Sequence, residues 1–252
     1  MTKEEILLKK RFVELSNAAF NRNIPVFTDF LNLNELNIFH SVSRELYTPY
    51  EVFGGYESAE RQMIVFIPDA FSRDIQELYP ISVIRIAPSH KKYADSLTHR
   101  DFLGALINLG VDRSKVGDIL VKDNEAILFC HENLADFFIE QLTKVKHTNV
   151  KVLTESLREF NYEPEFKMIK GSVSTTRIDS MLTLCCSCSR SQAVEYIMAK
   201  KVFLNGRLIE ANSETVKEQD VISVRGVGKF VFTGILSETK KGKIFIEIKK
   251  YV

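Results

Sequence analysis

The strongest constraint on the fold lies between residues 80 and 155, where strand-like and helix-like segments alternate. Apolar side chains alternate through Ile81–Ala87, as they do in a half-buried strand. Thr98, with Asp101 three positions later, predicts a helix start, and Gly110 predicts its end. Strands are then predicted at 116–121 and 125–130, a helix at 134–142 and a last strand at 150–153. The order β-α-β-β-α-β is that of a ferredoxin-like plait.

The regions on either side have different patterns. Before the plait, residues 1–79 have helical spacing over Glu4–Asn21 and Asn34–Arg44, then a Gly54-Gly55 turn and an apolar run at Met63–Ile67. Residues 156–171 are polar, lack a period and predict a linker. Residues 172–252 predict two short helices. Strands are then predicted at 202–204, 221–224, 229–236 and 243–250, with turns at Asn205-Gly206 and Lys241-Gly242.

Composition narrows the class of protein. The chain has 45% hydrophobic and 27% charged residues, which is ordinary globular composition. No apolar run approaches the roughly 18 residues of a membrane helix, and Met1–Lys10 lacks the apolar stretch of a signal peptide. We therefore expect a cytoplasmic protein with no membrane partner. Cys130, Cys185, Cys186 and Cys188 have neither disulfide-framework nor zinc-site spacing, so free thiols and no metal are expected.

Charge divides unevenly along the chain. Residues 165–252 contain 15 Lys and Arg against 9 Asp and Glu, a net of +6. The remainder contains 19 against 24, a net of −5, so the two parts give the overall +1. A basic C-terminal region on an acidic body favours a polyanionic partner, although uneven surface charge alone gives the same count.

A helix start near residue 189 has the features of a phosphate site. Ser189 is placed to cap the helix, and Gln192 completes a capping box. The unpaired N–H groups of such an end favour an anion, and Arg190 adds a forked cation. Two helices and the next turn are therefore predicted to present one basic face that reads phosphate position and RNA shape. The candidate RNA-binding residues are Arg177, Ser189, Arg190, Lys200, Lys201, Asn205, Arg207, Arg225 and Lys229.

The order and spacing of these residues resemble the S4 RNA-binding domain of ribosomal, tRNA-modifying and heat-shock proteins. The body, through the runs 53–61 and 97–119, resembles the YlmH-type S4 proteins of bacteria. The expected fold class is thus α+β: an N-terminal α/β region (1–79), an RRM-like plait (80–155), a linker (156–171) and an S4 domain (172–252). One residue departs from the S4 pattern, because Lys200 stands where a glycine often ends the second helix.

The resemblance implies structured RNA, both rRNA and tRNA, as the partner and the large ribosomal subunit as the place of action. Similar S4 proteins hold stalled peptidyl-tRNA there during ribosome-associated quality control. It also implies RNA contacts for Arg177, Ser189, Arg190 and Arg207. No DNA partner is expected.

A second candidate surface, for RNA or protein, contains His99, Arg100 and Arg113. The strand at 125–130 lacks the basic-glycine-aromatic signature of an RNA-recognition motif, so Phe129 is predicted to lie in the core. His99-Arg100-Asp101 lacks the other kinase motifs, and no glycine-rich nucleotide loop is present. We therefore expect no catalytic residues and no cofactor. Two alternatives stay open: an RNA-modifying enzyme of the pseudouridine synthase or methyltransferase kind, and a protein-interaction adaptor.

Overall fold

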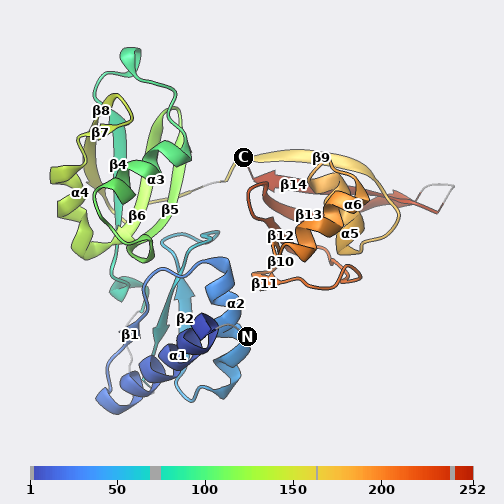
Figure 1. The fold of residues 1–252 in the computed structure, drawn as a ribbon, viewed down its shortest axis with the longest axis horizontal. Helices are drawn as coiled ribbons and strands as arrows, with labels where there is room; N and C mark the ends of the chain where they lie inside the picture. Colours follow the sequence, from blue (N-terminus) through green and yellow to red (C-terminus); the bar gives the residue numbers. More distant parts are fainter. Residues whose placement is uncertain (1–2, 69–74, 163, 239–241, 252) are drawn as a thin grey trace. The chain divides into compact units, whose positions relative to one another are not determined.

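A computed structural model describes residues 3–68, 75–162, 164–238 and 242–251 of the chain. The chain divides into two compact units, Met1–Tyr162 and Glu163–Val252 (Figure 1). Helices and strands occur in both units, so the expected α+β class is confirmed. Among the described residues, no helix is both long enough and apolar enough to cross a membrane.

The first unit opens with two helices on a small antiparallel sheet of strand order β1-β3-β2. Phe12 in α1 meets Phe39 in α2 edge to face at 5.2 Å, and both rings are buried. The helical spacing predicted both helices, whereas β1 and β2 were not predicted. The elements are α1 (Lys3–Arg22), β1 (Val26–Phe27), α2 (Leu33–Val42), η1 (Ser43–Glu45), β2 (Tyr50–Phe53), β3 (Met63–Phe66) and η2 (Gln76–Leu78).

The predicted plait follows in the same unit, with strand order β5-β6-β4-β8-β7. Helices α3 and α4 cover one face of the sheet, where Phe102 and Phe138 are fully buried against Ile84 and Leu128. The elements are β4 (Ile81–Pro88), η3 (Lys91–Tyr93), α3 (His99–Asn108), η4 (Arg113–Lys115), β5 (Val116–Lys122), β6 (Glu125–His131), η5 (Glu132–Leu134), α4 (Ala135–Gln141), β7 (Lys144–Val145) and β8 (Thr148–Glu155).

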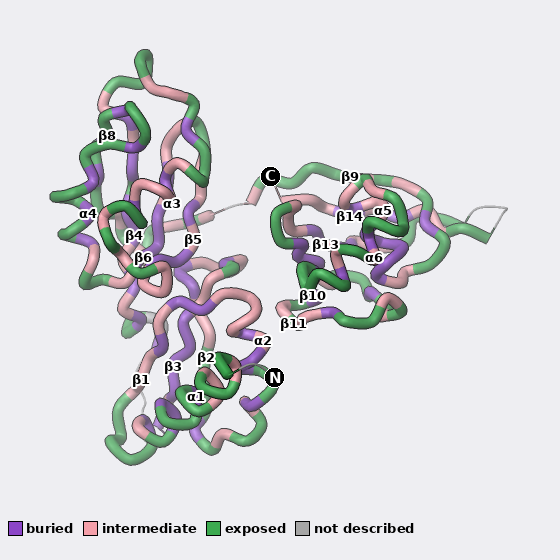
Figure 2. The backbone as a smooth tube through the Cα atoms, viewed as in Figure 1, coloured by how far each residue is buried: buried purple, intermediate pink, exposed green. Residues whose placement is uncertain are grey.

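The plait and the N-terminal region share a hydrophobic core. Val83 and Phe129, on the sheet face away from the plait helices, pack with Met63 and Val65 of β3. All four residues of β3 are buried (Figure 2). Phe129 also contacts Phe160 edge to face at 5.2 Å, which confirms that its ring belongs to the core. The sheet face around Phe129 is therefore closed to stacked bases.

Arg61 joins the two regions by polar contacts. Its guanidinium donates from Nε to the Val116 carbonyl at 2.8 Å, and from Nη2 to the carbonyls of Phe30 and Arg113 at 2.9 and 3.0 Å. The backbone N–H of Arg61 donates to Asp118 at 3.1 Å. One planar group thus holds the Phe30 carbonyl together with two carbonyls of the continuous η4–β5 segment, a geometry for which arginine is suited.

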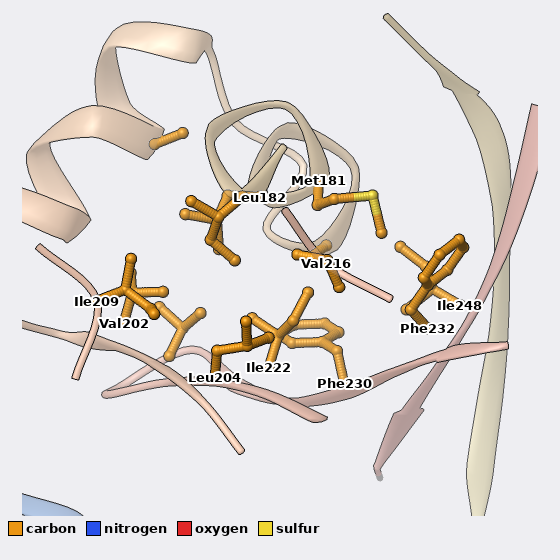
Figure 3. Close-up of a cluster of buried hydrophobic side chains, with 14 of the residues drawn as sticks. Met181, Leu182, Val202, Leu204, Ile209, Val216, Ile222, Phe230, Phe232 and Ile248 are labelled. Carbon is orange, nitrogen blue, oxygen red and sulfur yellow. The ribbon is translucent and has the colours of Figure 1, made fainter. Parts of the chain in front are cut away.

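The second unit is a six-stranded sheet of order β11-β10-β12-β13-β14-β9 with two helices on one face. Met181 and Leu182 of α5 lie against Ile222, Phe230 and Phe232 of the sheet (Figure 3). The elements are β9 (Phe166–Val173), α5 (Ile178–Cys185), α6 (Arg190–Met198), β10 (Val202–Leu204), β11 (Arg207–Leu208), β12 (Val221–Val224), β13 (Gly228–Glu238) and β14 (Ile244–Tyr251).

The linker expected at 156–171 is wrong over its second half. Residues 166–171 belong to β9, which pairs with β14 from Phe166 against Tyr251 to Val173 against Ile244. Most side chains of this edge strand are exposed, so its sequence lacks the apolar alternation of a half-buried strand. The turn expected at Lys241-Gly242 lies partly outside the described residues, because Lys241 is not among them.

Candidate nucleic-acid interface

Helices α5 and α6 begin close to one another at the candidate interface. Ser189 caps α6: its hydroxyl accepts from the Gln192 N–H at 3.3 Å, and Gln192 Oε1 accepts from the Ser189 N–H at 3.0 Å. The predicted capping box is therefore present. Arg177 is the N-cap residue of α5, and the next N–H, of Ile178, donates to the Glu214 carbonyl at 2.8 Å.

A buried carboxylate, Asp179, joins the two helix starts. Arg190 donates to its Oδ2 from Nε at 3.1 Å and from Nη2 at 2.7 Å. Arg177 Nη2 donates to the same oxygen at 3.3 Å. Burial raises the pKa of Asp179, but the hydrogen bond from Arg190 and the charges of Arg190 and Arg177 together lower it by more, so the pKa lies below its ordinary value.

The two arginines remain open to solvent although they share one carboxylate. The Arg177 side chain is 42% exposed and that of Arg190 is 61% exposed. An arginine has five N–H donors, so each guanidinium retains donors beyond those given to Asp179. Two positive charges against one negative charge leave a net positive site beside the N-terminus of α6, which can bind a phosphate.

Arg207 is connected to the start of α5 through Glu214. Its guanidinium pairs with the carboxylate of Glu214, whose carbonyl accepts from Ile178 at the start of α5. The Arg207 side chain is largely exposed, so this is a solvated pair that a phosphate can compete with. Arg177 and Arg190 thus share one carboxylate, and Arg207 is linked to the start of α5 through Glu214.

Lys200 and Lys201 end α6 in a Schellman motif. Lys200 adopts the left-handed conformation with φ +55°, and its N–H donates to the Ile197 carbonyl at 2.9 Å. The N–H of Lys201 donates to the Tyr196 carbonyl at 3.0 Å, which completes the motif. The departure from the usual glycine is therefore accommodated by a lysine in a strained conformation. The Lys200 ammonium lies 3.4 Å from Glu210 in a solvated ion pair.

Asn205 and Arg225 have structural contacts of their own. Asn205 Nδ2 donates to Asp220 at 2.8 Å, and its Oδ1 accepts from the Val221 N–H at 2.8 Å. Both polar atoms of the amide thus shape the turn between β10 and β11. The Arg225 guanidinium lies 5.2 Å from the centre of the buried Phe203 ring, and Lys229 lies 5.0 Å from that of Tyr251.

The residues of the second candidate surface have different environments. The Arg113 guanidinium donates to the carbonyls of Val116 and of Gly117, the latter at 3.0 Å. Burial and the charge of Arg61 lower the pKa of Arg113 to about 10. Arg113 therefore acts first as a bridge within the first unit. His99 is the first residue of α3, and partial burial together with the charge of Arg113 lowers its pKa.

Arg100 faces a hollow that sequence reasoning missed. The hollow has a volume of about 470 Å³ and lies between α3 and the segment that joins α4 to β7. Lys144 and Lys146 also line it, and Lys146 Nζ lies 3.8 Å from Asp101. These lysines are distant from α3 in the sequence, and no motif connects them to it. Only the folded plait shows that three cations meet there.

The cysteines of the second unit lie at the end of α5 and in the turn that leads to α6. Cys185 is buried, and Cys186 and Cys188 are partly buried. Burial raises the pKa of Cys186 to about 12 and also raises the pKa of Cys185 and Cys188. In the described part of the chain, no group of three or more His, Cys, Asp or Glu residues is placed to hold a metal ion.

Comparisons with known proteins match two stretches of the chain to domain families. Residues 75–159 match the family model described as a putative RNA-binding domain in YlmH, and residues 176–222 match the S4 domain. The chain is 29% identical, over 220 residues, to the ribosome-associated protein quality control protein P2 of Bacillus subtilis (strain 168). That alignment covers 86% of this chain and 83% of the relative.

A solved structure extends the comparison to the fold. The cell division protein YlmH from Streptococcus pneumoniae superimposes with a TM-score of 0.52 at 23% identity. The match covers 63% of this chain and 95% of that chain. The resemblance to YlmH-type S4 proteins expected from the sequence is therefore confirmed. The chain carries a YlmH-type domain followed by an S4 domain, and its role includes RNA binding.

Proposed function

We propose that this protein binds ribosomal RNA and tRNA at the large ribosomal subunit without catalysing a reaction, in the cytoplasm. Within this role it holds stalled peptidyl-tRNA during ribosome-associated quality control. The observation that carries the proposal is the pair of exposed guanidinium groups that Asp179 holds beside the N-terminus of α6. The pair lies inside the stretch that matches the S4 domain.

Two further observations support this role. The relative from Bacillus subtilis is named for ribosome-associated protein quality control. The site also has the chemistry of phosphate recognition, because it combines forked cations with a helix N-terminus. Such contacts position a protein on structured RNA without reading base identity, which suits recognition of a ribosomal surface.

The test is sedimentation of the tagged full-length protein from a cell lysate, with sequencing of crosslinked RNA. We expect the protein to sediment with large subunits and to crosslink to rRNA and tRNA. The double variant Arg177→Gln/Arg190→Gln should leave the subunit fractions. The matched control Arg11→Gln/Arg22→Gln removes the same charge from exposed α1 and should sediment as the wild type does.

Other sedimentation results would contradict the proposal. Wild-type protein that remains at the top of the gradient would do so, particularly if it crosslinks to a single non-ribosomal RNA. That pattern is expected of an RNA-modifying enzyme. Protein that sediments with ribosomes but crosslinks to no RNA would instead indicate a protein-interaction adaptor.

A further inference from the structure

A second feature of the C-terminal unit lies outside the stretch that matches the S4 domain. Strands β13 and β14 follow residue 222, and β9 precedes residue 176. Phe230, Phe232 and Ile248 of these strands point toward Met181 and the core (Figure 3). Because successive side chains of a strand point to opposite faces, the residues between them lie on the face away from α5 and α6.

The strand register defines that outer face. Val231 pairs with Lys249, which pairs with Met168 in β9. Tyr251 pairs with Phe166 in the neighbouring row. We name this surface the aromatic–lysine face, and its residues are Phe166, Met168, Lys229, Lys249 and Tyr251.

Rings and cations alternate closely on this face. The rings of Phe166 and Tyr251 meet edge to face with centroids 4.8 Å apart. Lys249 Nζ lies 5.5 Å from the centre of the Phe166 ring, and Lys229 Nζ lies 5.0 Å from that of Tyr251. Both distances are within the range of a cation–π contact. Each aromatic ring therefore has an ammonium group beside it.

The face is open to solvent in the described part of the second unit. Phe166 is 39% exposed and Met168 is 43% exposed, and both helices of this unit pack on the opposite face of the sheet. Glu247 on this side pairs with Lys170 at 2.8 Å. Lys229 and Lys249 place ammonium groups beside the exposed rings, and this combination favours an occupant that is both anionic and aromatic.

We propose that the aromatic–lysine face binds single-stranded RNA. Unpaired bases stack on Phe166 and Tyr251, and the flanking phosphates lie at Lys229 and Lys249. This inference rests on the proposed function, because it takes RNA as the partner. It assigns a different class of contact, since the arginines at Asp179 bind phosphates of structured RNA whereas this face binds unpaired bases.

The test compares three RNAs that share one stem-loop. The first is the stem-loop alone, the second has a short unpaired uridine extension, and the third has an abasic extension of equal length. We expect the uridine extension to tighten binding of the wild-type protein about tenfold, since stacking on an aromatic side chain has an effect of this order. The abasic extension, which retains the phosphates, should recover only a minor part of that gain.

Substitutions test whether the gain in affinity arises at the aromatic–lysine face. Phe166→Leu/Tyr251→Leu should lose the tenfold gain and still bind the bare stem-loop as the wild type does. Lys229→Gln/Lys249→Gln provides a second route if the aromatic variant fails to fold, and it should lose most of the gain. Tyr93→Leu is the matched control, because Tyr93 is 81% exposed with Lys92 Nζ 5.8 Å from its ring centre, outside the proposed face. It should retain the full gain.

The outcomes separate this inference from the proposed function. If folded Phe166→Leu/Tyr251→Leu keeps the full gain, or if the abasic extension gives an equal gain, the aromatic–lysine face does not bind bases and the role of the arginines stands. If the wild-type protein binds none of the three RNAs, the proposed function fails and this inference fails with it. Binding to anionic lipid vesicles that competes with the extended RNA would also overturn the assignment to RNA.

Discussion

Arg190 donates two hydrogen bonds to one carboxylate oxygen of Asp179, from Nε at 3.1 Å and from Nη2 at 2.7 Å. Arg177 donates to the same oxygen from the start of the preceding helix. The acid is buried, whereas both arginines reach solvent. Asp179 therefore holds two cations in fixed positions on a surface where free side chains would be mobile.

Replacing Asp179 with asparagine should destabilise the protein. We expect the variant to lose about 1–2 kcal/mol of unfolding free energy, because it removes hydrogen bonds to a charged group while the freed arginines remain solvated. Urea denaturation of the full-length protein at neutral pH measures this loss. An unchanged denaturation midpoint would show that the two ion pairs add no stability.

The ion pairs of Asp179 with Arg177 and Arg190 predict that the stability of the protein depends on pH. The pKa of Asp179 is lowered in the folded state, so its contribution is present above the ordinary carboxyl pKa and disappears as the pH falls through the lowered value. The stability curves of the wild type and Asp179→Asn should therefore be separate at neutral pH and converge in acid. Curves that stay parallel down to acidic pH would contradict this linkage.

Arg61→Lys should weaken the first unit. The guanidinium reaches three carbonyls on two segments, and a single ammonium cannot span them. We expect a loss of about 2–3 kcal/mol in unfolding free energy, because the carbonyls of Phe30 and Arg113 lose this donor, whereas the Val116 carbonyl still accepts from Arg113. Thermal melting against the exposed control Arg100→Lys, which should change by less than about 0.5 kcal/mol, provides the comparison. Equal melting temperatures for both variants would refute the bridging role.

Two glycines should respond to alanine in opposite directions. A Cβ at Gly55 would lie 2.3 Å from the Phe129 ring at φ +102°, so Gly55→Ala should cost about 2–4 kcal/mol through overpacking and backbone strain. Gly104 is in α3 with nothing within 4 Å of the added carbon, so Gly104→Ala should stabilise by about 0.5–1 kcal/mol. Chemical denaturation of both variants tests the pair. A Gly55→Ala variant as stable as the wild type would show that the turn tolerates a side chain, and a destabilised Gly104→Ala would contradict the helix prediction.

Lys200→Gly should stabilise the end of α6. The residue has φ +55°, where glycine is free of the strain that a side chain brings. The exposed Glu210 pair that it loses contributes little, so we expect a net gain of about 0.5 kcal/mol. Lys201→Gly lies outside the strained position and is the control, which should not gain. A loss of stability in Lys200→Gly would mean that the ion pair outweighs the backbone strain.

Helices and strands that depend on neighbouring residues, through a capping pair or apolar alternation, were predicted from the sequence. The capping pair Ser189 and Gln192 marked the start of α6, and the apolar alternation of Ile81–Ala87 marked β4. β9 gave no such signal, because an edge strand with exposed side chains has little apolar alternation and forms through its pairing with β14. The linker boundary was wrong for this reason.

In the candidate site, too, some residues could be predicted from the local sequence and others could not. Arg190 was predicted from its position at a helix start, and Arg177 from its place in the preceding helix and the S4 pattern. Asp179, which holds them together, was recognised only from its buried position. Arg113 looked like a surface cation in the sequence, yet its donors are directed at the carbonyls of Val116 and Gly117. Contacts between residues distant in the chain decide such cases, and a single sequence does not encode them locally.

The salt dependence of RNA binding tests the central claim most directly. Affinity for a ribosomal RNA fragment should fall steeply with salt, and the triple variant Arg177→Gln/Arg190→Gln/Arg207→Gln should bind more weakly. Its slope of log affinity against log salt should be flatter by about one for each phosphate that the variant no longer neutralises. The triple variant Arg11→Gln/Arg22→Gln/Arg44→Gln removes equal charge from the first unit and should match the wild type. If the folded interface variant keeps wild-type affinity and slope, Arg177, Arg190 and Arg207 do not form the RNA-binding site.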